Sequence, residues 1–157
     1  EGFHAFLDNF LFPEGQSASV PRWLNEGLAQ YFELSRIEGD RFVLGQEDRD
    51  RMAILRRFKR EDSLLPLEKL IAGEQKDYIV HDIANLETST KNYLQAWLLV
   101  NVMGEKGRLT RDNLKAYAEA LTAKKSPPDA LQILSGVPNP DLSKQMEEKL
   151  KPSYQGQ

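Results

Sequence analysis

Apolar residues recur along the chain at helical spacing. In the segment 1–12 they occupy positions 3, 6, 7, 10 and 11, and this i, i+3, i+4, i+7, i+8 pattern predicts an amphipathic helix. Residues 13–17, which include Pro, Gly and Ser, interrupt the pattern. A second helix is predicted over 21–35, because Pro21 suits a first helical position. The residues that form its apolar stripe are Leu24, Leu28, Tyr31 and Phe32.

The middle of the chain predicts one hairpin and two more helices. The segment 37–45 is the one plausible small β-hairpin, with its turn at Glu38–Asp40. A helix is predicted over 47–59, since acidic residues lie in its first turn and basic residues in its last, as the helix dipole favours. A short helix is predicted over 66–72, and 74–90 is predicted to be irregular.

The last third of the chain predicts several strong helices. Ser89 or Thr90 can cap a helix over 91–103, and Gly104 and Gly107 are predicted to stop it. Further helices are predicted over 110–123, capped by Thr110, over 127–134, ended by Gly136, and over 141–150.

These elements predict one mainly α domain over 1–157. A chain of 157 residues can bury a proper core, and its 40% hydrophobic and 29% charged residues are ordinary for a globular protein. The sequence contains neither a repeat nor a low-complexity segment. Because the chain begins with Glu rather than Met, we interpret it as a fragment or processed piece of a larger protein.

Charge and cysteine content exclude several classes of function. The net charge of −3 argues against a phosphate-binding surface, and acidic residues are interleaved with or adjacent to the basic residues of 49–60, as on a solvated helix face. The absence of cysteine excludes disulfides and thiolate metal sites. No apolar run reaches the roughly 18 residues that a membrane span needs. We therefore expect neither nucleic acid nor a membrane span, whereas oligomeric state and compartment stay open, with an extracytoplasmic location in a bacterium among the options.

The first candidate motif is Glu1-Gly-Phe-His4, a Glu-x-x-His pair on the first predicted helix. In the signature HExxH, two histidines on one helix face bind zinc and the Glu lies beside the zinc-bound water. The chain begins at this Glu, so the first histidine of the signature is absent from it. Alone, Glu-x-x-His arises by chance in many chains, and the alternative interpretation is a surface Glu with an ordinary half-buried His.

The second candidate motif is the segment Trp23–Tyr31, with the sequence WLNEGLAQY. Glu26 is the only charged residue between Arg22 and Glu33, and an acid among apolar neighbours is costly unless it is paired or bound to a metal. The alternative interpretation is an ion pair with Arg22, four residues earlier. Gly27 lowers helix propensity by about 1 kcal/mol, which is tolerable where two helix backbones approach closely.

The two motifs together resemble the gluzincin zinc metallopeptidases. These include the aminopeptidase-N-like enzymes and related peptidase MA-like domains often found in bacterial proteins. In that clan HExxH is followed, about twenty residues later, by a Glu within a W-L-N-E-G-x-A-x-Y stretch, and 21 residues separate His4 from Glu26 here. The resemblance implies a helical, zincin-type catalytic C-terminal subdomain, zinc as cofactor, and a peptide or protein as substrate.

The resemblance also implies roles for four residues. Glu1 would be the general base, and His4 and Glu26 would be zinc ligands. Tyr93 would stabilise the oxyanion, because it lies 67 residues after Glu26 at the start of the helix predicted over 91–103. The clan has an extra residue in this region, and the alternative for Tyr93 is a core aromatic with its hydroxyl at the surface.

The missing first histidine is the main departure from the clan pattern. His81, the only other histidine, is far from the first helix in sequence, and we interpret it as a surface or loop residue. We interpret the chain as a truncated view of an intact motif and expect the isolated chain to be inactive or nearly so. The alternative is a non-catalytic helical binding or scaffold domain that kept the fold after losing its metal. A His before Glu1 in the full-length gene would favour the enzyme.

Overall fold

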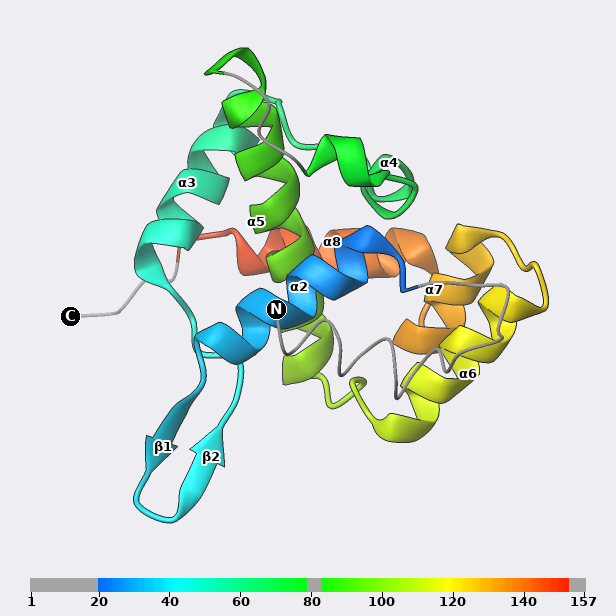
Figure 1. Cartoon of the computed structure of the whole chain (residues 1–157). Coiled ribbons are helices and arrows are strands. Elements are labelled where there is room, and N and C mark those ends of the chain that lie inside the picture. The colour runs from blue at the N-terminus through cyan, green and yellow to red at the C-terminus, as the bar shows by residue number, and fades with distance from the viewer. Residues whose placement is uncertain (1–19, 79–82, 153–157) are drawn as a thin grey trace.

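The computed structural model describes residues 20–78 and 83–152, and within them the chain is mainly helical. These residues form seven α-helices, one 3-10 turn and one two-stranded sheet (Figure 1). The predicted mainly α fold with one small hairpin is confirmed. The helix predicted over 1–12 lies outside the described residues. Within the described ranges, no helix is long and apolar enough to cross a membrane.

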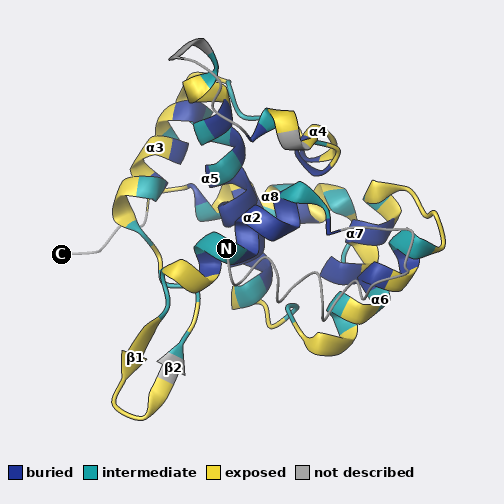
Figure 2. Ribbon diagram, viewed as in Figure 1, coloured by how far each residue is buried: buried dark blue, intermediate teal, exposed yellow. Residues whose placement is uncertain are grey.

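Two helices at the centre of the molecule make its most extensive contact. α2 (Arg22–Glu33) lies across α5 (Ile83–Glu105), and the contact side of both helices is buried (Figure 2). A Cβ atom on Gly27 would lie 2.6 Å from the backbone oxygen of Ala96 and 2.6 Å from Cγ2 of Val100. Only glycine therefore allows this approach, which confirms the close backbone contact suggested for Gly27.

The other helices surround this central pair (Figure 1). α3 (Arg49–Arg60) packs against α5, while α6 (Arg111–Thr122) and α7 (Pro127–Ser135) pack on each other. α8 (Asn139–Lys149) contacts both α5 and α7, and α4 (Leu67–Ile71) also reaches α7. Their buried apolar side chains join those of α2 and α5 in one continuous core.

Most helix ends follow the expected capping chemistry. The Thr110 hydroxyl accepts a hydrogen bond from the Asn113 N–H at 3.2 Å at the start of α6, and Gly136 ends α7 with a φ of +68°. Both predictions are confirmed. Asp48 caps α3 by accepting from the Arg51 N–H at 2.9 Å. Pro21 precedes α2 at its N-cap, one position before the predicted one.

The predicted hairpin is present and projects from the helical body (Figure 1). β1 (Arg36–Glu38) pairs antiparallel with β2 (Arg41–Val43), with Glu38 opposite Arg41. Gly39 lies in the turn with a φ of +65°, a backbone conformation that glycine adopts without strain. The turn predicted at Glu38–Asp40 is therefore confirmed.

The start of α5 corrects the sequence prediction. Residues 74–90 were expected to be irregular, but η1 (Gln75–Asp77) is a 3-10 turn and α5 already begins at Ile83. Ser89 is buried inside the helix and does not cap it. Packing overrides the local preference of Ser89 for a helix cap, because Ser89 lies on the buried side of α5.

The end of α5 also differs from the prediction. Gly104 does not stop the helix, which continues to Glu105, and the chain turns at Gly107 with a φ of +66°. A Cβ atom on Gly104 would lie 2.5 Å from the hydroxyl oxygen of Tyr31. Because Gly104 has no side chain, the Tyr31 side chain of α2 can pack directly against α5 at this position.

Lys149, at the end of α8, forms ion pairs with two other parts of the fold. Its Nζ lies 3.0 Å from the Glu47 carboxylate and also donates to the Glu105 carboxylate, and its side chain is 17% exposed. Burial acts to lower the pKa of Lys149, but the hydrogen bonds and negative charges of Glu105 and Glu47 outweigh it and raise that pKa above 10.5. These ion pairs therefore favour the charged, folded state.

Lys149→Met is expected to lower the free energy of unfolding by about 1 kcal/mol, because both glutamates are half exposed and partly screened. The folded pKa is raised, so the stabilisation is full below about pH 10.5 and is lost as pH rises through the folded value. Urea unfolding of wild type and variant at about pH 8 and about pH 11 measures this difference. Lys144→Met, at an exposed position of the same helix, is the control. If the free energies of unfolding of wild type and Lys149→Met differ as much at pH ~11 as at pH ~8, the expectation is contradicted.

Candidate functional site

Glu26 lies on the buried side of α2 and is 7% exposed. Its Oε1 atom lies 2.8 Å from a terminal guanidinium nitrogen of Arg22, one helical turn earlier, and the Arg22 side chain is 29% exposed. The ion pair named as the alternative for Glu26 is therefore present. It supplies the positive charge that a buried carboxylate needs.

Tyr93 lies on the part of α5 that α2 crosses, and it is half-buried. Burial raises the pKa of Tyr93, and the negative charge of Glu26 raises it further, whereas a hydrogen bond and the positive charge of Arg22 act to lower it. The structure therefore brings Glu26 and Tyr93 into one electrostatic cluster, although Tyr93 comes 67 positions later in the sequence. Arg22 takes part in the same cluster.

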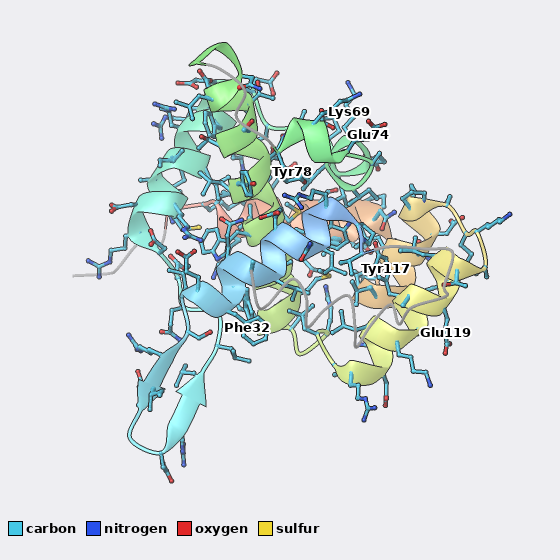
Figure 3. All side chains as sticks on the ribbon, viewed as in Figure 1. Phe32, Lys69, Glu74, Tyr78, Tyr117 and Glu119 are labelled. Carbon is cyan, nitrogen blue, oxygen red and sulfur yellow. The ribbon has the colours of Figure 1, made fainter. Side chains whose placement is uncertain are left out.

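Tyr78 is a fourth member of this cluster, and no sequence motif pointed to it. Its ring packs edge-to-face against that of Tyr93, with centroids 5.4 Å apart, and it is 1% exposed. Burial and the charge of Glu26 raise the pKa of Tyr78. Its buried hydroxyl has no hydrogen-bond partner among the described residues. Tyr78 lies beside α5 (Figure 3), and we call Arg22, Glu26, Tyr78 and Tyr93 the α2–α5 cluster.

Gln30 links α2 to α5 beside the α2–α5 cluster. Its Nε2 donates to the backbone oxygen of Tyr93 at 2.8 Å and to that of Glu26 at 3.2 Å. Its Oε1 accepts from Arg51 at 3.2 Å. One side chain of α2 thereby holds the backbone of α5 at the level of Tyr93.

Arg51 does not lie on a solvated helix face, as was expected for the basic residues of 49–60. Its guanidinium lies 5.7 Å from the centre of the Trp97 ring and pairs with Glu33 at 2.9 Å. The side chain is only 20% exposed. Arg51 therefore supports Gln30 in the α2–α5 contact, because its charge is balanced by Glu33 and its guanidinium lies over the Trp97 ring.

The other predicted site residues, Glu1 and His4, lie outside the described residues, as does His81, which was interpreted as a surface or loop residue. Within the described ranges, no three His, Asp or Glu side chains gather as a metal site. Glu26 is the one predicted zinc ligand that the structure describes. A carboxylate is a group that zinc binds, but Glu26 is buried and paired with Arg22, and it would supply only one of the three protein ligands that a hydrolytic zinc needs. The predicted ligand His4 and the first histidine of HExxH, which this chain does not contain, would have to supply the other two.

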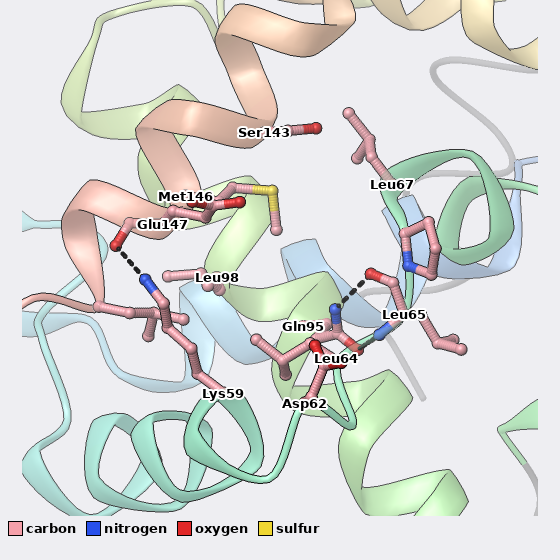
Figure 4. A pocket seen from close by; sticks show the side chains of 12 residues that line it. Lys59, Asp62, Leu64, Leu65, Leu67, Gln95, Leu98, Ser143, Met146 and Glu147 are labelled. Carbon is pink, nitrogen blue, oxygen red and sulfur yellow. Dashed lines mark hydrogen bonds between the residues drawn. The ribbon is translucent and has the colours of Figure 1, made fainter.

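A cavity of about 350 Å³ lies elsewhere, between the loop after α3 and helices α5 and α8 (Figure 4). None of the α2–α5 cluster lines it. The side-chain amide of Gln95 is engaged there by the backbone N–H and C=O of Leu65, both at 3.0 Å, and Lys59 donates to the backbone oxygen of Glu147 at 3.2 Å. Its remaining walls include several leucines and Met146. Because no predicted site residue lines it, the cavity is not a candidate for the predicted chemistry.

The chain matches a known protein family over most of its length. The family described as "Protein of unknown function (DUF1570)" matches residues 1–129, a range that includes both sequence motifs, α2 and α5. No curated protein and no solved structure matches the chain.

Proposed function

We propose that this chain, which belongs to the DUF1570 family, is part of a zinc-dependent metallopeptidase that resembles the gluzincins. One observation carries the proposal. Glu26, the acid of the WLNEGLAQY segment, is buried on α2, and Gln30, one turn later on the same helix, donates a hydrogen bond of 2.8 Å to the backbone oxygen of Tyr93 on α5. The resemblance places Glu26 and Tyr93 in one active site. The contact between α2 and α5 supports this placement, because it brings the two helices that carry them together.

Each residue would have a distinct task in peptide hydrolysis. Glu26 and His4 would hold the zinc, which supplies Lewis-acid chemistry and lowers the pKa of a water molecule to about 7 when bound. The carboxylate of Glu1 would accept a proton from the attacking water and pass it to the leaving amine. The Tyr93 hydroxyl would donate a hydrogen bond to the carbonyl oxygen as negative charge develops on it. Gln30 would keep α5 in the register that this task requires.

The proposal is tested by assaying the full-length protein on an unstructured protein and on a library of quenched fluorescent peptides. We expect cleavage that a zinc chelator abolishes and that added zinc restores. The residue before Glu1 in the full-length gene is expected to be His. A zinc-loaded protein that cleaves none of these substrates would contradict the proposal.

Tyr93→Phe is expected to lower kcat by about 10²–10³-fold with little change in KM, because one donor to the developing oxyanion is removed. The ring stays in place against Tyr78, so the free energy of unfolding should change little. Steady-state kinetics of the full-length protein measure the effect. Tyr117→Phe, which removes another buried tyrosine hydroxyl on α6, should leave kcat unchanged. An unaltered kcat in Tyr93→Phe would mean that Tyr93 is only a core aromatic.

The Arg22–Glu26 pair also favours a second candidate function, a helical binding or scaffold domain that needs no metal. The pair places a positive charge 2.8 Å from the buried carboxylate, so the fold does not require zinc to compensate that charge. A scaffold would lose stability when Glu26 is neutralised and would show no specific zinc affinity. An enzyme would lose zinc affinity at the same substitution.

A further inference from the structure

The outer edge of β1 is the most exposed stretch of backbone in the projecting hairpin. The sheet has two strands among the described residues, so β1 pairs there with β2 alone. All three residues of β1 are exposed, and Ile37 is 76% exposed (Figure 2). An open strand edge is a template for pairing with another chain. We propose that β1 pairs antiparallel with β1 of a second copy of this chain and so forms a symmetric dimer.

The two-residue turn of the hairpin determines which backbone groups of β1 face outward. Glu38 and Arg41 flank the turn, and such a flanking pair carries the hydrogen bond that closes a β-turn. Hydrogen-bonded and non-hydrogen-bonded pairs alternate along an antiparallel ladder. The next pair, Ile37 with Phe42, is therefore non-hydrogen-bonded. The backbone N–H and C=O of Ile37 consequently face away from β2, toward the open edge.

The sequence of β1, Arg36-Ile37-Glu38, is complementary to itself in antiparallel pairing. When Ile37 lies opposite Ile37 of the second copy, each outward N–H meets an outward C=O, which gives two backbone hydrogen bonds across the two-fold axis. Arg36 then lies opposite Glu38 of the other copy on both sides of the axis. Opposite charges at directly opposed positions stabilise a sheet. A parallel arrangement in the same register would oppose like charges, so the charges favour the symmetric dimer.

The side chains of β1 are available for these contacts. Arg36 and Glu38 pair with each other at 2.5 Å on one face of the strand, and their side chains are 61% and 51% exposed. Ile37 points to the opposite face, because side chains alternate along a strand. In the dimer the two isoleucines lie next to each other on that face. Pairing therefore removes exposed apolar surface from water as well as joining charges.

The position of the hairpin in the molecule leaves room for a second copy. The hairpin projects from the helical body (Figure 1). Antiparallel pairing along β1 places the two helical bodies at opposite ends of the joined four-stranded sheet. The four charged residues of the hairpin, Arg36, Glu38, Asp40 and Arg41, sum to zero, so two hairpins do not repel each other. The inference is independent of the proposed function, because no residue of β1 belongs to the α2–α5 cluster.

Sedimentation equilibrium of the full-length protein, at about 10 µM to about 1 mM, tests this pairing. Three paired residues bury less than the roughly 1,200 Å² of a stable interface, so we expect a wild-type dissociation constant on the order of 100 µM. Arg36→Glu and Glu38→Arg each oppose two pairs of like charges across the axis and should weaken self-association at least about tenfold. Ile37→Pro removes the outward N–H from each copy, in a strand position where proline is tolerated, and should weaken it as much.

Mixing the two charge variants separates pairing from a loss of the hairpin fold. An equimolar mixture of Arg36→Glu and Glu38→Arg opposes Glu to Arg at both positions, so it should associate within about threefold of wild type although neither variant does so alone. The control is Arg57→Glu, the same charge change at an exposed arginine of α3, which should alter self-association less than about twofold.

Two results would overturn the inference. One is a wild type that stays monomeric at about 1 mM, which would leave the edge of β1 to a strand of a different protein. The other is self-association that is equally strong in wild type, Arg36→Glu and Ile37→Pro, because the contact would then lie elsewhere on the molecule. Neither result bears on zinc binding or peptide cleavage.

Discussion

Glu26→Gln is expected to weaken the zinc affinity of the full-length protein by more than about a hundredfold and to abolish peptide cleavage. Loss of an outer-shell partner already costs about 10–100-fold in affinity, so loss of a direct ligand should cost more. Glutamine has nearly the same shape as glutamate, and its amide oxygen can still accept a hydrogen bond from Arg22. The fold should therefore persist, with a cost limited to the lost charge of one ion pair.

The measurement is zinc titration of the wild type and the variant, with circular dichroism as the check on folding. Glu61→Gln is a matched control, because Glu61 also follows its arginine partner, Arg57, by four residues but is exposed. It should bind zinc and cleave peptides as wild type does. If Glu26→Gln instead lowers the free energy of unfolding and leaves zinc affinity unchanged, Glu26 is a structural ion-pair partner of Arg22.

Gly27→Val is expected to have the largest effect on stability, a loss of at least about 3 kcal/mol in the free energy of unfolding. Even a Cβ atom at this position would lie 2.6 Å from the Ala96 backbone oxygen. The obstacle is the backbone of a long buried helix, so no side-chain rotation relieves it. Any movement of α2 away from α5 would also separate Glu26 from Tyr93.

Urea unfolding of the purified protein tests this expectation. Ala29→Val places the same side chain two residues further along α2, at a partly exposed position. It should cost less than about 1 kcal/mol, the range of helix propensity alone. A Gly27→Val protein as stable as the Ala29→Val protein would mean that the two helices are not held at this distance.

The helices were predictable where local chemistry decides their ends. Caps such as Thr110 and the left-handed glycine at Gly136 act within a few residues, so the sequence alone locates α6 and α7 well. The start of α5 was not predictable in this way. Ser89 and Thr90 favour caps locally, but α5 buries Ser89 and continues as a helix from Ile83.

The candidate site was predictable only in part, for a similar physical reason. Glu26 is conspicuous as a single charge among apolar residues, and the spacing to Arg22 already indicated an ion pair. Tyr93 was found through the family resemblance and not through any local pattern. Tyr78 was missed, because its contact with Tyr93 depends on how the segment before α5 folds back on that helix.

The central claim, that Glu26 is a ligand of a bound zinc, is tested most directly by metal analysis of the purified full-length protein. After expression in zinc-supplemented medium, the wild type is expected to carry about one zinc per chain and Glu26→Gln less than about a tenth of that. A wild-type protein that is folded yet retains less than about a tenth of an equivalent would contradict the claim.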